Sequence, residues 1–172
     1  MNNKALLVGI NKYPDPNNEL RGCINDILDM EKYISVTNTI YKKENIKKLT
    51  DKQASKKSIV THLQWLVEGA AAGDQLLFHY SGHGSQLPSA NEDDGFEEII
   101  CPIDLDWKTK LISDDTLRDI FNRVPPGVNT TVILDCCHSG TMLDHSESLQ
   151  IETSEILSEK AIELTVPAKG RF

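Results

Sequence analysis

The feature that most constrains the fold is the alternation of short, continuously apolar segments with longer segments whose apolar residues recur at helical spacing. The apolar segments are residues 4–11, 75–80 and 130–134. Strands that are apolar throughout, rather than alternating with polar residues, are covered on both faces. The sequence therefore predicts an α/β domain whose mainly parallel central sheet is flanked by helices on both faces.

Three amphipathic helices are expected between these strands. In residues 23–34 the apolar positions recur at helical spacing, with acidic residues between them. Ser55 and Ser113 are placed to cap two further helices, because a serine side chain accepts a hydrogen bond from the amides of the first turn. The second helix is expected to end at Gly69 and the third before Pro125.

The remaining segments carry weaker patterns. Residues 46–50 are predicted to be extended, and residues 81–98, rich in glycine, serine, asparagine and acids, are predicted to form a loop. A small strand pair is expected around residues 99–102 and Leu111. Residues 145–172 have few core residues and no clear period, so we expect a linker or tail there.

The composition is typical of a globular protein and argues against nucleic acid as a partner. The chain has 172 residues, of which 39% are hydrophobic and 26% charged, enough for one domain with a sizeable core. Its formal charge of −8 argues against nucleic acid as a partner, because binding to phosphate backbones requires clustered Lys and Arg.

No apolar run approaches the roughly 20 residues that cross a bilayer, and none near the N-terminus is long enough for a signal-peptide core. We therefore expect a cytoplasmic protein with no membrane partner. In that reducing setting its four cysteines are expected to be buried, catalytic or metal-linked rather than disulfide-bonded.

Two of the predicted strands end in turns that carry reactive side chains. The strand at residues 75–80 leads into His-Tyr-Ser-Gly-His-Gly, and the strand at residues 130–134 leads into Asp-Cys-Cys-His-Ser-Gly. Ligands of open α/β sheets bind at the carboxyl ends of the strands. A thiol there can act as a nucleophile when an imidazole helps to ionise it, and Cys137 and His83 fit these two roles. The glycines beside His83 leave backbone amides open, so Gly84 and the Cys137 amide are candidates for an oxyanion hole.

These two motifs, about 50 residues apart, resemble the paired catalytic motifs of metacaspases and their bacterial relatives, which are caspase-like cysteine peptidases. The resemblance extends over about residues 4–144. It implies a caspase-like fold in which Cys137 rather than Cys136 is the nucleophile, and His83 rather than His79 its partner. It also implies that residues 1–144 are a p20-like catalytic domain and residues 145–172 a linker toward a p10-like part, which we expect to be a separate small subunit or a C-terminal part.

A carboxylate at Asp135 would disfavour a nearby thiolate, so its presence needs another reason. An acidic pocket for a substrate Arg or Lys supplies one, because a carboxylate binds such side chains through charge-assisted hydrogen bonds. The resemblance agrees: metacaspases cleave after basic residues, and the family's acidic pocket residues match Asp26 and Asp135. Cys23 and Ser81 match further positions that line this pocket.

Calcium is a candidate cofactor, and no organic cofactor is expected. The chain has several acids with the hard oxygen atoms that calcium prefers. The resemblance implies Asp114, Asp115 and Asp144 as ligands, with Glu97 at a position where the family has Asp. Asp114 and Asp115 could instead simply complement a helix dipole. Structural zinc is disfavoured, because no spaced Cys or His pair is present.

The sequence thus predicts a cysteine endopeptidase that cleaves proteins or peptides after Arg or Lys. The alternative from a different functional class is a noncatalytic caspase-like interaction or scaffold module. The presence of both His83 and Cys137 favours the enzyme.

Overall fold

The computed structural model describes residues 1–37, 40–88 and 96–136. Its main feature is a parallel sheet with strand order β2-β1-β3-β7. These strands are β1 (Lys4–Gly9), β2 (Ile46–Thr50), β3 (Gln75–Ser81) and β7 (Asn129–Asp135). All three apolar segments of the sequence form strands of this sheet, so the predicted α/β class is confirmed.

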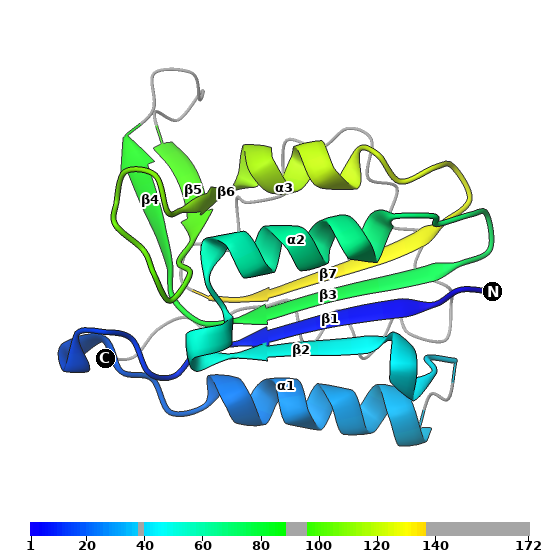
Figure 1. Cartoon of the computed structure of the whole chain (residues 1–172), viewed down its shortest axis with the longest axis horizontal. Coiled ribbons are helices and arrows are strands. Elements are labelled where there is room, and N and C mark those ends of the chain that lie inside the picture. Colours follow the sequence, from blue (N-terminus) through cyan, green and yellow to red (C-terminus); the bar gives the residue numbers. More distant parts are fainter. Residues whose placement is uncertain (38–39, 89–95, 137–172) are drawn as a thin grey trace.

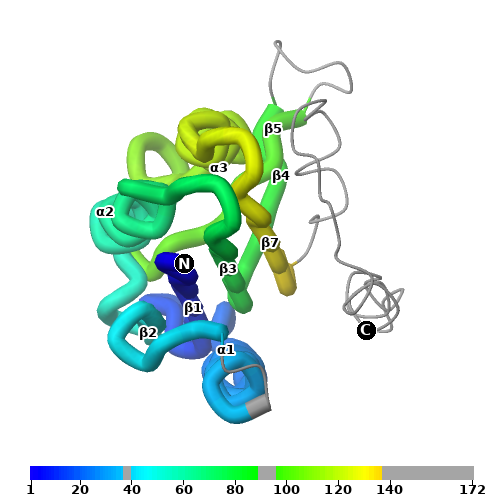
Figure 2. Tube along the Cα trace, turned by 90° about the vertical axis from the view of Figure 1, so that its right-hand side faces the viewer, coloured from blue at the N-terminus to red at the C-terminus, as the bar shows by residue number. Residues whose placement is uncertain are grey.

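Helices cover both faces of the parallel sheet (Figures 1 and 2). They are α1 (Cys23–Lys32), which continues into the π-helical turn η2 (Tyr33–Thr37), α2 (Lys56–Val67) and α3 (Asp114–Phe121). Short 3-10 turns lie at η1 (Pro16–Asn18), η3 (Lys43–Asn45) and η4 (Asp51–Gln53). Figure 2 shows α2 and α3 together on one face and α1 on the other.

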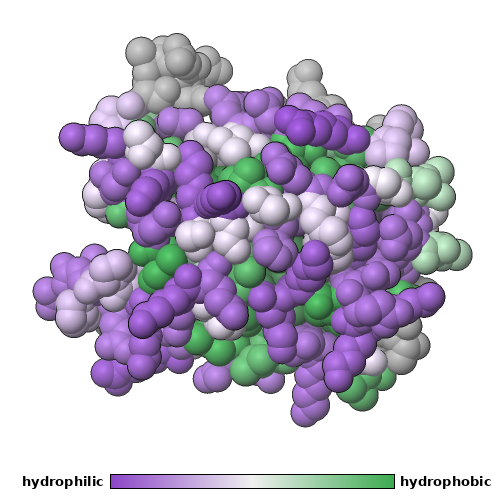
Figure 3. Space-filling model, viewed as in Figure 1, coloured by the Kyte–Doolittle hydropathy of each residue, from purple (hydrophilic) through white to green (hydrophobic). Residues whose placement is uncertain are grey.

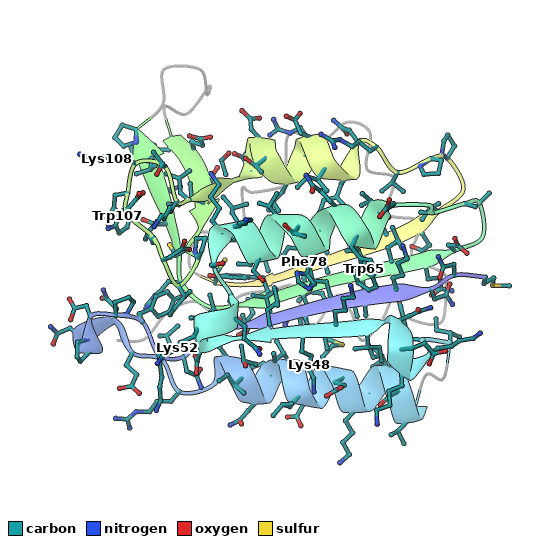
Figure 4. The ribbon with its side chains drawn as sticks, viewed as in Figure 1. Lys48, Lys52, Trp65, Phe78, Trp107 and Lys108 are labelled. Atoms are coloured by element: carbon teal, nitrogen blue, oxygen red, sulfur yellow. The ribbon has the colours of Figure 1, made fainter. Side chains whose placement is uncertain are left out.

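Two hydrophobic cores form because alternate side chains of each strand point to opposite faces. Leu6 and Phe78 belong to the core under α2 and α3, whereas Leu7 and Leu77 belong to the core under α1. Phe78 is fully buried beneath α2 (Figure 4), and its ring centroid lies 6.2 Å from that of Phe121 in α3. Both predicted serine caps are present: Ser55 accepts from the Ser58 amide, and Ser113 accepts from the Thr116 amide.

A second, antiparallel sheet corrects the prediction of a loop at residues 81–98. It has the strand order β4-β5-β6 and consists of β4 (Gly84–Pro88), β5 (Phe96–Ile100) and β6 (Ile112–Ser113). The loop prediction was wrong at both ends because β4 is only half-buried and its polar residues lack the apolar signal of a core strand. The strand pair expected around residues 99–102 and Leu111 is present with slightly different bounds. Ile99 pairs with Ser113, and Ile100 pairs with Ile112.

The surface seen in Figure 3 is covered predominantly by hydrophilic side chains, with smaller apolar areas between them. Across residues 1–37, 40–88 and 96–136, the structure has no helix with the length and apolar character that a membrane span requires.

Candidate active site

The carboxyl ends of β1, β3 and β7 meet at one edge of the parallel sheet, on the left of Figure 1. In the strand register Ser81 lies beside Asp135, and just beyond them the Gly82 amide donates to the Asp135 carbonyl over 3.3 Å. His83 and Cys137 each follow two residues after this pair. The register therefore brings the two motif-bearing segments together. Cys137 itself lies outside the described residues, and its role stays a prediction.

The imidazole of His83 is held by a backbone carbonyl. Its Nε2 lies 2.8 Å from the carbonyl oxygen of Asn18 in η1. A carbonyl only accepts hydrogen bonds, so Nε2 carries the proton and Nδ1 of the neutral ring keeps a lone pair. This tautomer leaves Nδ1 as the atom that can take a proton from a thiol.

Two tyrosine hydroxyl groups surround the backbone of His83. The His83 amide donates to Tyr13 Oη over 2.9 Å, and Tyr80 Oη lies 2.8 Å from the His83 carbonyl oxygen. Gly82 makes this arrangement feasible, because a Cβ atom there would lie 2.6 Å from Tyr80 Oη and 2.9 Å from Tyr13 Oη. Sequence reasoning did not single out Tyr13, since no local pattern signals a partner 70 residues away.

The amide of Gly84, a candidate oxyanion donor, points away from β5. The Cys101 amide donates to the His83 carbonyl over 3.0 Å, so these two residues form a hydrogen-bonded position of the antiparallel ladder. The next pair, Gly84 and Ile100, is then a non-hydrogen-bonded position. The Gly84 N–H is consequently not used by this ladder and is available as a donor, which an oxyanion hole needs.

The predicted acidic pocket is assembled from three elements. Ser81 Oγ of β3 lies 2.9 Å from Asp26 Oδ2 of α1 and 3.4 Å from Asp135 Oδ2 of β7. A hydroxyl has one proton, so it satisfies only one of the two carboxylates at a time. Among the described residues neither carboxylate has an ion-pair partner. The structure thus brings Asp26, Ser81 and Asp135 together.

Glycine at position 9 allows the start of α1 to approach this pocket. A Cβ atom at Gly9 would lie 2.7 Å from the Cys23 carbonyl oxygen and 2.9 Å from Ile27 Cδ1. Cys23, the fourth predicted pocket residue, is buried there. Burial raises the pKa of its thiol, and nearby Asp26 acts in the same direction, while a hydrogen bond with Ser81 opposes them. The Cys23 thiol is therefore protonated at neutral pH.

His79 lies beneath the acidic pocket rather than at its surface. Its side chain is only 5% exposed, and its Nδ1 has no hydrogen-bond partner. Burial lowers the pKa of the imidazole, although Asp135 and Asp26 oppose this shift. A neutral ring under the two carboxylates leaves their charge uncompensated, and His83 is the more accessible of the two histidines.

Three of the four predicted calcium ligands can be placed. Asp114 Oδ2 pairs with Arg118 Nη2 at 2.9 Å, Asp115 pairs with Arg118 Nη1, and Glu97 is half-buried on β5. The fourth, Asp144, lies outside the described residues. Within residues 1–37, 40–88 and 96–136 no group of three acidic, His or Cys side chains gathers around one point.

One atom nevertheless fits a cation. Asp114 is 2% exposed, and its Oδ1 is buried without a partner. Burial raises the pKa of this carboxyl, a hydrogen bond with the Asp115 backbone and the charge of Arg118 oppose the increase, and the negative charges of Asp115 and Glu98 add to it. A hard cation at Oδ1 would relieve this unfavourable burial, with Glu98 as a second oxygen donor.

Comparison with known proteins identifies the family of this site. Residues 3–146 match the family model described as metacaspase, peptidase C14 domain. Metacaspase-1A of Aspergillus oryzae is 44% identical over 149 residues, covering 82% of this chain and 35% of that protein. Metacaspase-4 of Arabidopsis thaliana is 44% identical over 155 residues, covering 86% of this chain and 36% of that protein.

A solved structure has a similar fold. The crystal structure of a Geobacter sulfurreducens protein superimposes with a TM-score of 0.64 at 28% sequence identity, covering 82% of this chain and 52% of that one. The chain spans about a third of the length of the curated relatives.

Proposed function

The chain belongs to the metacaspase family and contains its peptidase C14 domain, and from this premise we propose that it is a cysteine endopeptidase that cleaves after Arg or Lys. The observation that carries the proposal is the register of β3 and β7, which pairs Ser81 with Asp135. It supports placing the His83 imidazole next to the Cys137 thiol.

In the proposed reaction Cys137 Sγ attacks the carbonyl carbon of the scissile peptide bond, and its proton passes to Nδ1 of His83. His83 then gives that proton to the leaving amine, which departs as the new N-terminus. Water hydrolyses the remaining thioester and restores the thiol. The Gly84 and Cys137 amides would stabilise the negative charge on the carbonyl oxygen.

The proposed preference for Arg or Lys is supported by the two carboxylates that share the Ser81 hydroxyl. A guanidinium or ammonium group would satisfy the charge that this hydroxyl leaves uncompensated on Asp26 and Asp135. His79, buried and held neutral, would not compete with the substrate cation. An acidic side chain would be repelled from the same place.

Calcium binding at Asp114 and a p10-like part are further proposals. Bound calcium would supply charge compensation to buried carboxylates, with Glu97, Asp115 and Asp144 as the other predicted ligands. Titration of the full-length protein with calcium chloride in a calorimeter is expected to give a binding heat that Asp114→Asn abolishes. Equal heats in the two proteins would contradict the assignment.

For the p10-like part, the support is that β7 pairs only with β3 in the described residues. A strand contributed from outside these residues would fit the other edge of β7. We therefore propose that the rest of the substrate groove is built there.

The peptidase activity is tested with fluorogenic peptides that end in Arg, Lys or Asp, using the full-length protein with and without calcium. We expect turnover of the Arg and Lys peptides only, with a fall of about 1,000-fold or more in kcat for Cys137→Ala and for His83→Ala. Wild-type turnover that equals that of Cys137→Ala would contradict the proposal and favour the noncatalytic scaffold.

A further inference from the structure

The hydroxyl of Tyr13 stands inside the hydrogen-bond ladder at the position of His83. In an antiparallel sheet a hydrogen-bonded pair of residues exchanges two bonds. One of them is present, since the Cys101 amide donates to the His83 carbonyl over 3.0 Å. The other is relayed: the His83 amide donates to Tyr13 Oη over 2.9 Å, and that hydroxyl donates to the Cys101 carbonyl over 3.1 Å.

The ring of Tyr13 also packs against the His83 imidazole. The two ring centroids are 4.7 Å apart, with an angle of 55° between the ring planes. One side chain therefore contacts both the backbone and the ring of the same histidine. With the hydrogen bond from Nε2 to the Asn18 carbonyl, these contacts restrict both the position of His83 and the rotation of its imidazole.

Tyr13 keeps both hydrogen-bonding roles over the physiological pH range. Burial raises the pKa of its hydroxyl to about 12, against the opposing effect of its hydrogen bonds with Tyr80 and His83. Tyr80 Oη lies 3.4 Å from Tyr13 Oη. The Tyr80 hydroxyl donates its proton to the carbonyl oxygen of either His83, at 2.8 Å, or Cys101, at 3.0 Å. The hydrogen bond of Tyr80 with His83 is therefore to the carbonyl, whereas the His83 amide donates to Tyr13.

We propose that Tyr13 is a positioning residue for His83, which it holds in the orientation that directs Nε2 to Asn18 and leaves Nδ1 for the thiol. The proposal rests on the proposed function, because it assumes that His83 is the acid and base of the reaction. Tyr13 acts through His83 and is given no contact with the substrate.

The test variant is Tyr13→Phe, which keeps the ring and removes the hydroxyl. Loss of the relay leaves the His83 amide either to pair directly with the Cys101 carbonyl or to lose its partner, and either outcome moves the imidazole. We expect kcat of the full-length protein for an Arg-ending peptide to fall about 10- to 100-fold while KM changes little, because orientation acts on the chemical step. Tyr80→Phe is expected to give a smaller fall.

Tyr41→Phe is the matched control. Tyr41, like the partly buried Tyr13, has a hydroxyl whose pKa burial raises to about 12, but it is buried in the other core, under α1. The same atom is thus removed from a comparable environment away from His83. Tyr41→Phe is expected to retain the kcat of the wild type, and thermal unfolding of both variants shows whether each one is folded.

A second measurement does not depend on turnover. Nitrogen NMR of histidine-labelled protein is expected to show His83 in the Nε2–H tautomer in wild type and Tyr41→Phe, and a mixture of tautomers in Tyr13→Phe. Equal spectra or equal kcat in Tyr13→Phe and Tyr41→Phe would overturn the proposal. In wild type alone, a His83 amide that exchanges with solvent as fast as a free amide would also overturn it. Absence of turnover in wild type would contradict the proposed function and leave the NMR test of Tyr13 intact.

Discussion

Two neighbouring regions at the carboxyl edge of the parallel sheet are built in opposite ways. Around His83 the backbone amide, the backbone carbonyl and the imidazole Nε2 all have hydrogen-bond partners. In the acidic pocket Ser81 serves two carboxylates with one proton, and the buried Nδ1 of His79 has no partner.

The two regions therefore suit different tasks. A saturated network fixes one geometry, which suits a group that must transfer a proton at a set distance. The carboxylates of the pocket become fully compensated only when a cation binds. The same uncompensated negative charge therefore supplies both binding energy and selectivity for a cation. Substitutions in the first region should affect kcat, and substitutions in the second should affect selectivity and KM.

Among the changes that distinguish the two regions, the largest effect is expected from Asp135→Asn. Removing the exposed carboxylate leaves a substrate guanidinium with a single acidic partner, and kcat/KM for an Arg-ending peptide should fall about 100-fold or more. Asp29→Asn, on the exposed side of α1, is the matched control and should change little. Steady-state kinetics checks both. An equal and small effect of the two substitutions would show that Asp135 does not bind the substrate Arg.

A smaller effect is expected from Gly9→Ala. The added methyl group would meet the Cys23 carbonyl oxygen at 2.7 Å, so the start of α1 must move away from the sheet and carry Asp26 with it. We expect destabilisation by about 1–3 kcal/mol from overpacking. KM for an Arg-ending peptide should rise more than kcat falls, as measured by urea unfolding and steady-state kinetics. A fall in kcat at unchanged KM would show that the two regions are not separable.

The smallest effect concerns His79 and pH. Burial lowers the pKa of His79 in the folded protein, so between that value and the ordinary value of about 6.5 the unfolded chain binds a proton that the folded chain does not. Stability should therefore fall as the pH decreases below about 6.5. His79→Phe removes this contribution, and its urea midpoint should fall less between pH 7.5 and 5.5 than that of wild type. Equal decreases would show that His79 is not held neutral.

Much of the fold could be predicted because burial on both faces leaves a strong signal in the sequence. β1, β3 and β7 are central or covered strands, and each appears as an apolar run. The strand β4 and the first half of β5 escaped prediction because their stability depends on pairing with each other, and β4 has no buried residue. Half-exposed antiparallel strands with Gly, Ser and Glu do not differ in composition from a loop.

The candidate site divides in the same way. Residues that follow an apolar strand directly, such as His83 and Asp135, could be placed at the sheet edge from the sequence. Tyr13 could not be connected to His83, since the two are 70 residues apart and their contact depends on how far β1 and β3 extend. Asp26 was assigned to the pocket through family resemblance, because helical spacing alone is also compatible with a solvated surface acid.

The proposed catalytic site is tested most directly by covalent labelling of the full-length protein with a peptidyl acyloxymethyl ketone that ends in Arg, followed by mass spectrometry of the digested protein. We predict a single adduct on Cys137, which is lost in His83→Ala and does not form with the matching Asp-ending reagent. An adduct on Cys136, or equal labelling by the Arg and Asp reagents, would contradict it.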